Sequence, residues 1–256
     1  MEEITKGLSN IIVWQDDILV YASDRESLAV TVNSLLIILN KKNVKINWDK
    51  SVRCVDEVTF LGHVINEKGI GPDPDLVSVI MSMQPPSSLK ELERFISMIN
   101  FYCTKIPQFA EKCIPLNKLR RKGVVFAWTA EQQDAFECLR NAFCSRRLVQ
   151  PYSLQKEATL TCDASENSIG GVISQNGLPV MFMSRTLLPA EKNYANIERE
   201  ALSIMWCVKR AEKLLLGRHF TIVEYVLIIN HWSLFLAKGK AYLKLLLPGC
   251  NVGQLF

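Results

Sequence analysis

The segment that decides the fold reads Ile11-Ile12-Val13-Trp14-Gln15-Asp16-Asp17-Ile18-Leu19-Val20-Tyr21. Two β-rich apolar stretches flank the two acids, and this pattern predicts a tight hairpin whose strands enter a core. Neighbouring carboxylates in such a setting are costly unless a divalent cation or a shifted pKa neutralises them. Asp is also a common turn residue that bonds to its own backbone, so spacing alone leaves a metal site and a plain acidic turn both open.

Several further motifs follow the hairpin in a fixed order. They are Phe60-Leu61-Gly62-His63-Val64-Ile65, Gly69-Ile70-Gly71-Pro72-Asp73-Pro74, Ser88-Leu89-Lys90-Glu91-Leu92, Asn100-Phe101-Tyr102, Phe126-Ala127-Trp128-Thr129, Ala135-Phe136, Thr161-Cys162-Asp163-Ala164-Ser165 and Leu188-Pro189-Ala190-Glu191-Lys192-Asn193-Tyr194. Across about residues 1–232 the chain resembles the Pol polyproteins of Ty3/gypsy-type retrotransposons with long terminal repeats, with Trp14 where that family usually carries Tyr. Many motifs matched in one order are far more specific than any single one.

The resemblance implies an α/β (α+β) fold, in which a truncated reverse transcriptase palm and thumb precede an RNase H-like mixed-sheet domain. It places a partial palm at residues 1–70, thumb or connection helices at 71–125 and the RNase H-like domain at 126–232. Residues 233–256 resemble nothing in the family and are treated as a divergent tail.

The polymerase part of the resemblance assigns Asp16 and Asp17 as catalytic ligands of Mg²⁺ (or Mn²⁺) in an RNA-directed DNA polymerase, a nucleotidyltransferase. In two-metal sites of this kind the ions stabilise the attacking and leaving oxygens. The family draws another Asp from an earlier palm strand, together with fingers, and only fifteen residues precede Asp16. We therefore expect an impaired polymerase centre that needs missing Pol segments in cis or in trans.

The RNase H part of the resemblance assigns Asp163 and Glu200 as catalytic and metal-binding carboxylates of an endonuclease that cuts RNA in an RNA–DNA hybrid. Helix geometry supports Glu200, because it shares a face with the apolar Ile204 and Cys207. An Asx turn at Asp163 and a helix-dipole role for Glu200 remain as plainer alternatives.

The third RNase H carboxylate of the family falls at Tyr225, within Phe220-Thr221-Ile222-Val223-Glu224-Tyr225-Val226. Glu224 is one residue away, and adjacent strand residues point to opposite faces, so it cannot substitute without a register slip. We expect Mg²⁺ or Mn²⁺ to be bound weakly and ribonuclease activity to be impaired.

Positive charge concentrates between Ser88 and Gly123, which carries eight basic and three acidic side chains, a net charge of +5 against +4 for the whole chain. Because this segment falls where the family's thumb grips a duplex, phosphate contact is favoured over a merely solvated helical face. The residues expected to bind RNA–DNA hybrid or duplex are Lys118, Arg120, Arg121 and Lys122. His63 lies at the family's primer grip, and a purely structural role for it stays open.

Local patterns predict the remaining elements. Helices are expected at 28–39, after the caps Ser88/Glu91 and Thr129/Gln132, and at about 190–215. Strands are expected at 44–47, 58–65, 158–162, 170–174, 180–184 and 220–229.

Composition excludes several classes of protein. The eight cysteines form no Cys-x-x-Cys pair, and no charged-then-apolar leader follows Met1-Glu2-Glu3. The apolar stretch from Ser233 to Leu247 is interrupted by three lysines, so no membrane span is expected. These features predict an intracellular protein, a cytoplasmic particle component or a nuclear one, with reduced thiols.

Two alternatives to an enzyme fragment remain at this stage. A non-catalytic module would still bind nucleic acid in a salt-sensitive way without turnover. A decayed copy would expose unpaired sheet edges and aggregate.

Overall fold

The structure is a computed structural model that describes residues 5–145, 148–228 and 237–246, with side chains described up to residue 223. The chain divides into two compact units, Met1–Glu67 and Lys68–Phe256. The proposed tail at 233–256 lies outside the described residues except for the backbone of 237–246.

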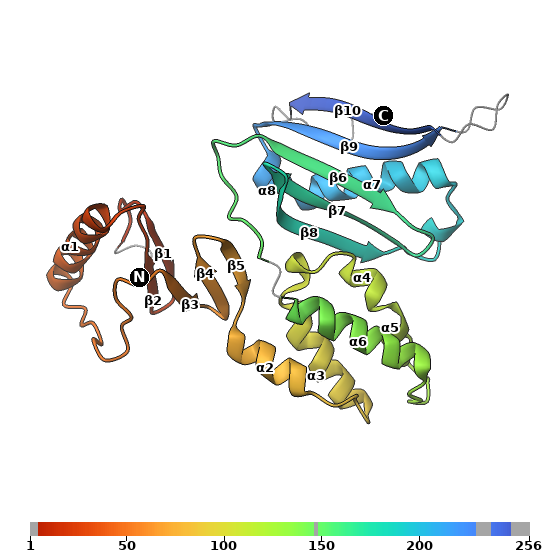
Figure 1. The fold of residues 1–256 in the computed structure, drawn as a ribbon, viewed down its shortest axis with the longest axis horizontal. Helices are drawn as coiled ribbons and strands as arrows, with labels where there is room; N and C mark the ends of the chain where they lie inside the picture. The colour runs from red at the N-terminus through yellow and green to blue at the C-terminus, as the bar shows by residue number, and fades with distance from the viewer. Residues whose placement is uncertain (1–4, 146–147, 229–236, 247–256) are drawn as a thin grey trace. The chain divides into compact units, whose positions relative to one another are not determined.

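The first unit contains two hairpins and a helix (Figure 1). Strands β1 (Ile11–Trp14) and β2 (Asp17–Val20) are antiparallel, with Trp14 opposite Asp17, and β3 (Glu57–Phe60) pairs with β4 (His63–Asn66). Helix α1 (Arg25–Lys41) begins at Asp24, whose carboxylate accepts a hydrogen bond from the Ser27 amide at 2.7 Å. The acidic hairpin and the helix predicted at 28–39 are therefore present.

Two expectations for this unit are wrong. Residues 58–65 form a hairpin instead of one strand, because Leu61 (φ 50°) and Gly62 (φ 75°) adopt the left-handed conformations of a two-residue hairpin turn. Residues 44–47 are irregular, since no described strand pairs with them and alternation alone cannot hold an extended segment.

The expectation that β1 and β2 enter a core is also wrong. Ile12 is 46% exposed and Trp14 57% exposed. Among the described residues, β1 and β2 form a sheet of only two strands, and such a ribbon cannot bury both of its faces.

The second unit opens with a helical part. Strand β5 (Gly69–Pro72) leads into α2 (Pro74–Ser82), α3 (Leu89–Asn100), η1 (Cys103–Lys105), α4 (Phe109–Lys112), α5 (Ile114–Leu119) and α6 (Ala130–Cys144). Their apolar faces form one buried cluster, which includes Leu92, Phe95, Phe109, Leu116 and Phe136. Helix α3 buries Leu92, Phe95, Ile96 and Ile99, while Leu89 at its start is 40% exposed. Helix α6, placed in the RNase H-like domain at the sequence level, packs in this helical cluster.

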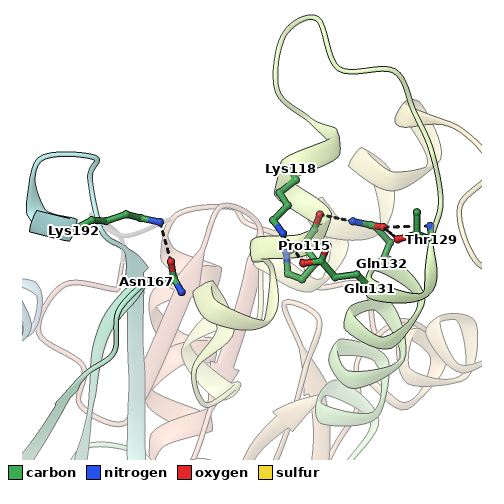
Figure 2. A network of polar contacts seen from close by, with 7 residues as sticks. All are labelled: Pro115, Lys118, Thr129, Glu131, Gln132, Asn167 and Lys192. Carbon is green, nitrogen blue, oxygen red and sulfur yellow. Dashed lines mark hydrogen bonds and ion pairs between the residues drawn. The ribbon is translucent and has the colours of Figure 1, made fainter.

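The two predicted capping boxes have different outcomes. At α6 the return bond forms, because the Gln132 side-chain oxygen accepts from the Thr129 amide at 3.3 Å and also from the Thr129 hydroxyl (Figure 2). Outside the box, the Gln132 side-chain amide donates to the Pro115 carbonyl at 3.3 Å. At α3 the Ser88 hydroxyl accepts from the Glu91 amide at 3.4 Å, but Glu91 accepts from the Ser87 amide instead of the Ser88 amide. The return bond is displaced by one residue.

A five-stranded mixed sheet follows, in the order β10-β9-β6-β7-β8 (Figure 1). Its strands are β6 (Ala158–Ala164), β7 (Ser168–Gln175), β8 (Leu178–Thr186), β9 (His219–Ile228) and β10 (Ala237–Leu246). Strand β6 is antiparallel to β7 and parallel to β9, while β7–β8 and β9–β10 are antiparallel. Strands β6 to β9 of this mixed sheet are predicted by the sequence, whereas β10 lies within residues 233–256, where no strand is expected.

One face of the sheet is covered by helix α7 (Asn196–Arg210). The buried side chains between them include Leu160 and Cys162 of β6 and Cys207 of α7. The helix predicted at 190–215 is interrupted, because Tyr194 and Ala195 are extended and separate η2 (Glu191–Asn193) from α7, and Ala211 separates α7 from α8 (Glu212–Leu215).

Within the described ranges, none of the helices is sufficiently long and apolar to cross a membrane.

Candidate functional site

Asp163 lies near the carboxyl end of β6, on the face of the sheet opposite to α7. Its neighbour Cys162 is buried against α7, so the alternation of the strand directs the Asp163 side chain outward, where it is exposed. Asp163 is opposite Gly170 of β7, and Gly170 is opposite Ser184 of β8. These three residues form a row across the sheet, which we call the Asp163 row.

A cleft of about 210 Å³ lies over the Asp163 row. Its other wall comes from α4, which contributes Glu111. The Ser168 hydroxyl donates to a Glu111 carboxylate oxygen at 3.2 Å, and the Ala110 amide donates to the Ser184 hydroxyl oxygen at 2.9 Å. The structure thus brings Glu111 to the cleft of Asp163. Sequence reasoning counted Glu111 only as an acid of the thumb, and no local signal could have revealed this contact.

Glu200 lies near the start of α7 and is half-buried. It does not line the cleft of Asp163. Helix α7 approaches Asp163 through Ser203, which lies one turn after Glu200 and is fully buried. The Ser203 hydroxyl bridges the backbone carbonyls of Asp163 and Gly170, at 3.0 Å from each.

The register between β6 and β9 bears on the third carboxylate. It runs without a shift from Ala158 opposite Phe220 to Cys162 opposite Glu224. The backbone of Glu224 therefore lies beside that of Cys162. Along β9, Tyr225 follows Glu224, as Asp163 follows Cys162 along β6. No register slip occurs in this stretch.

A two-metal cage does not fit the donors in the described part of the chain. There, no three His, Cys, Asp or Glu side chains gather as metal ligands would. Carboxylate cages of this type need several oxygen ligands around each ion. We therefore derive no metal-dependent step from this geometry.

Asp16 and Asp17 lie at the tip of the β1–β2 hairpin, and both are exposed. Gln15, with φ 50°, turns the chain there. Because water solvates both carboxylates, the burial cost that first suggested a metal site does not arise. An acidic turn explains the pair as well as a metal site does, and the metal role stays a prediction.

The predicted nucleic-acid contacts occur in two places. His63 is half-buried at the start of β4, in the first unit. The four basic residues 118–122 are exposed around the end of α5. The Lys118 ammonium forms an ion pair with Glu131 at 2.5 Å (Figure 2), and Arg120 donates to the Asn117 side chain at 2.8 Å. Arg121 and Lys122 make no ion pair with any residue that the structure describes.

The loop that follows Asp163 is held by cations from the next elements. The Lys192 ammonium donates to the Asn167 side chain at 2.9 Å (Figure 2), and Arg199 donates to the Ser165 carbonyl at 3.3 Å.

Arg185 of β8 forms a bidentate ion pair with Glu191, at 2.6 and 2.8 Å. These hydrogen bonds hold the pKa of Glu191 below its usual value.

Family models match two parts of the chain. Residues 1–65 match "Reverse transcriptase (RNA-dependent DNA polymerase)", and residues 128–222 match "RNase H-like domain found in reverse transcriptase". The Pol polyprotein of transposon 297 from Drosophila melanogaster is 35% identical over 230 residues, covering 88% of this chain and 21% of that protein. The Pol polyprotein of transposon gypsy from the same organism is 28% identical over 80% of this chain and 21% of its own length.

The relatives of this chain are Pol polyproteins of LTR retrotransposons. A yeast relative, the Tf2-3 polyprotein of Schizosaccharomyces pombe, is 28% identical over 88% of this chain and 17% of its own length. The chain thus spans about a fifth of the length of these Pol relatives and comprises reverse transcriptase and RNase H-like segments. The resemblance to Ty3/gypsy-type Pol proteins is confirmed.

Solved structures share the fold of this Pol fragment. A foamy viral protease-reverse transcriptase in complex with double-stranded DNA matches with a TM-score of 0.81 and 22% identity, over 89% of this chain and 41% of that chain. A second structure of that protein, in complex with RNA/DNA hybrid, matches with a TM-score of 0.79 and 22% identity, over 89% of this chain and 32% of that chain.

Proposed function

We propose that this Pol fragment binds RNA–DNA hybrid or duplex through the basic residues 118–122, and that its nucleotidyl transfer and RNA cleavage are impaired. The observation that carries the binding proposal is the exposed cluster at the end of α5, in which Arg121 and Lys122 have no ion-pair partner within the described residues. Cations of this kind are free to replace counterions on a phosphate backbone.

The impairment proposal rests on the carboxylates. By the resemblance to the family, Asp163 and Glu200 match two of its metal-ligand positions, while Tyr225 falls at the third. Loss of one ligand weakens metal binding and misplaces the attacking water, which costs orders of magnitude in rate. Mg²⁺ or Mn²⁺ at Asp163 and Glu200, and at Asp16 and Asp17, is accordingly proposed to bind weakly. Calorimetry that finds tight binding of two ions would contradict this.

Binding is tested by fluorescence anisotropy of a labelled RNA–DNA hybrid with the Arg120→Glu/Arg121→Glu variant. We expect the affinity to fall by roughly tenfold or more at low salt, and the salt slope to decrease by about two, since two phosphate contacts are lost. The matched control is Lys209→Glu/Arg210→Glu, which reverses two exposed adjacent charges at the end of α7. If the affinity fell equally in both variants, or fell in neither, residues 118–122 would not be the nucleic-acid interface.

Cleavage is tested with the same hybrid in Mg²⁺ or Mn²⁺, comparing the natural chain with Asp163→Asn. We expect no cleavage above the level of the variant. An active enzyme is the second candidate function, favoured by the retention of Asp163 and Glu200. Cleavage that Asp163→Asn abolishes would establish it.

A further inference from the structure

Helix α4 is too short to be stable by itself. It has four residues, and an isolated single turn fixes more backbone angles than its hydrogen bonds repay. The residue that precedes it, Gln108, has φ 52° and gives the helix no side-chain cap. Something outside α4 must therefore hold it.

Strand β8 supplies the missing cap. The Ser184 hydroxyl accepts the hydrogen bond of the Ala110 amide, across 74 residues of sequence, at 2.9 Å. The next residue of α4, Glu111, accepts from Ser168 of β7, which is only 6% exposed. Two consecutive residues of α4 are thus joined to two adjacent strands of the sheet.

The contact is made at the Asp163 row. Asp163 and Ser184 lie on either side of Gly170, whose lack of a side chain keeps the row open beneath α4. A Cβ on Gly170 would lie 3.3 Å from the Ser184 Cβ and 2.6 Å from the Met183 carbonyl oxygen. The hydroxyl that caps α4 and the carboxylate of Asp163 therefore lie in the same row of the sheet, on either side of Gly170.

The other side of α4 belongs to the helical core. Phe109 is 8% exposed within the buried helical cluster, and Cys113 directly links α4 to α5. Helix α5 in turn carries the basic residues 118–122 at its end. Two directional hydrogen bonds thus join α4 to the sheet beside the cleft, in addition to the direct contact of α4 with β8.

We propose that Ser184 and Ser168 are positioning residues that clamp α4 to the sheet, and thereby hold the basic residues 118–122 at a fixed distance from Asp163. The functional meaning rests on the proposed function, because it links the nucleic-acid contact to the RNase H-like site. The clamp itself is a property of the protein alone and can be measured without nucleic acid.

The test compares the full chain with Ser184→Ala/Ser168→Ala. Hydrogen exchange of the α4 amides should become roughly thirtyfold faster, as expected for the loss of two hydrogen bonds that contribute about 1 kcal/mol each. Spin labels introduced as unnatural amino acids at positions 122 and 166, both exposed, should show a broadened distance distribution. The control is Ser174→Ala, another serine of β7, whose hydroxyl donates to the Thr159 carbonyl at 3.4 Å.

Ser184→Thr/Ser168→Thr keeps both hydroxyls and should restore the exchange rates and the narrow distribution. An unchanged distance distribution and unchanged α4 exchange in the alanine variant would overturn the clamp. If the alanine variant does not fold, single Ser184→Ala and Ser168→Ala chains are measured in the same way, and equality with the natural chain in both would overturn it. Hybrid affinity, expected to change by less than roughly twofold, is measured separately. If none of these chains bound the hybrid, the proposed function would be contradicted. The clamp would still be decided by the hydrogen-exchange and distance measurements.

Discussion

At the scale of single residues, Ser203 shows how α7 is tied to the strand that carries Asp163. Serine in the middle of a helix usually bonds to the carbonyl one turn earlier. Here the hydroxyl is fully buried and is 3.0 Å from each of two carbonyls of the sheet, those of Asp163 and Gly170. One hydroxyl proton serves two acceptors, so the backbone of Asp163 is fixed to the helix that carries Glu200.

The ion pair of Arg185 and Glu191 gives a pH-dependent prediction at this scale. Arg185 lowers the pKa of Glu191, so the stabilisation is complete above the unfolded pKa near 4.5 and is lost as the pH falls through the lower folded pKa. Replacing Glu191 by Gln should reduce the free energy of unfolding by about 1.5 kcal/mol at pH 7.

The measurement is urea unfolding of the natural chain and Glu191→Gln from pH 7 to pH 3. The difference between them should shrink below pH 4.5. Glu166→Gln, an exposed acid in the loop after β6, serves as the control and should show no such difference. A gap that stays constant down to pH 3 would show that Glu191 acts through packing and not through its charge.

At the scale of elements, the cap of α6 gives a second prediction. Thr129→Ala removes the hydroxyl of the capping box, while Gln132 can still bond to the Thr129 amide and the Pro115 carbonyl (Figure 2). We expect the free energy of unfolding to fall by about 1 kcal/mol, with faster hydrogen exchange in the first turn of α6. Ser145→Ala, at the exposed end of the same helix, is the control, and an equal loss there would argue against a specific cap.

The elements also show what sequence could and could not predict. The α6 cap joins residues three apart, and strands β6 to β9 carry their own β-rich patterns, so both were predictable. The contact of Glu111 with Ser168 spans 57 residues and has no local signature. The single strand predicted at 58–65 failed because Leu61 adopts a positive φ, which is uncommon for a bulky residue.

At the scale of the whole molecule, burial is distributed unevenly between the two units. Both large buried clusters, one helical and one between the sheet and α7, lie entirely within the second unit. Among the described residues of the first unit, only three apolar side chains are buried, those of Leu35, Leu39 and Val64. The burial predicted for the acidic hairpin failed at this scale, because burial depends on what packs over both faces of a ribbon and not on its own sequence.

This uneven burial predicts that residues 68–256 fold without residues 1–67. Apolar burial is the main stabilising contribution, and the first unit has too little of it to be stable alone. We expect a chain of residues 68–256 to unfold cooperatively on heating and to retain protected amides in α3, α6 and β6. A chain of residues 1–67, measured under the same conditions by circular dichroism and hydrogen exchange, should show a broad transition or none. If the longer piece lacked protected amides while the complete chain had them, the first unit would have to contribute to the core of the second.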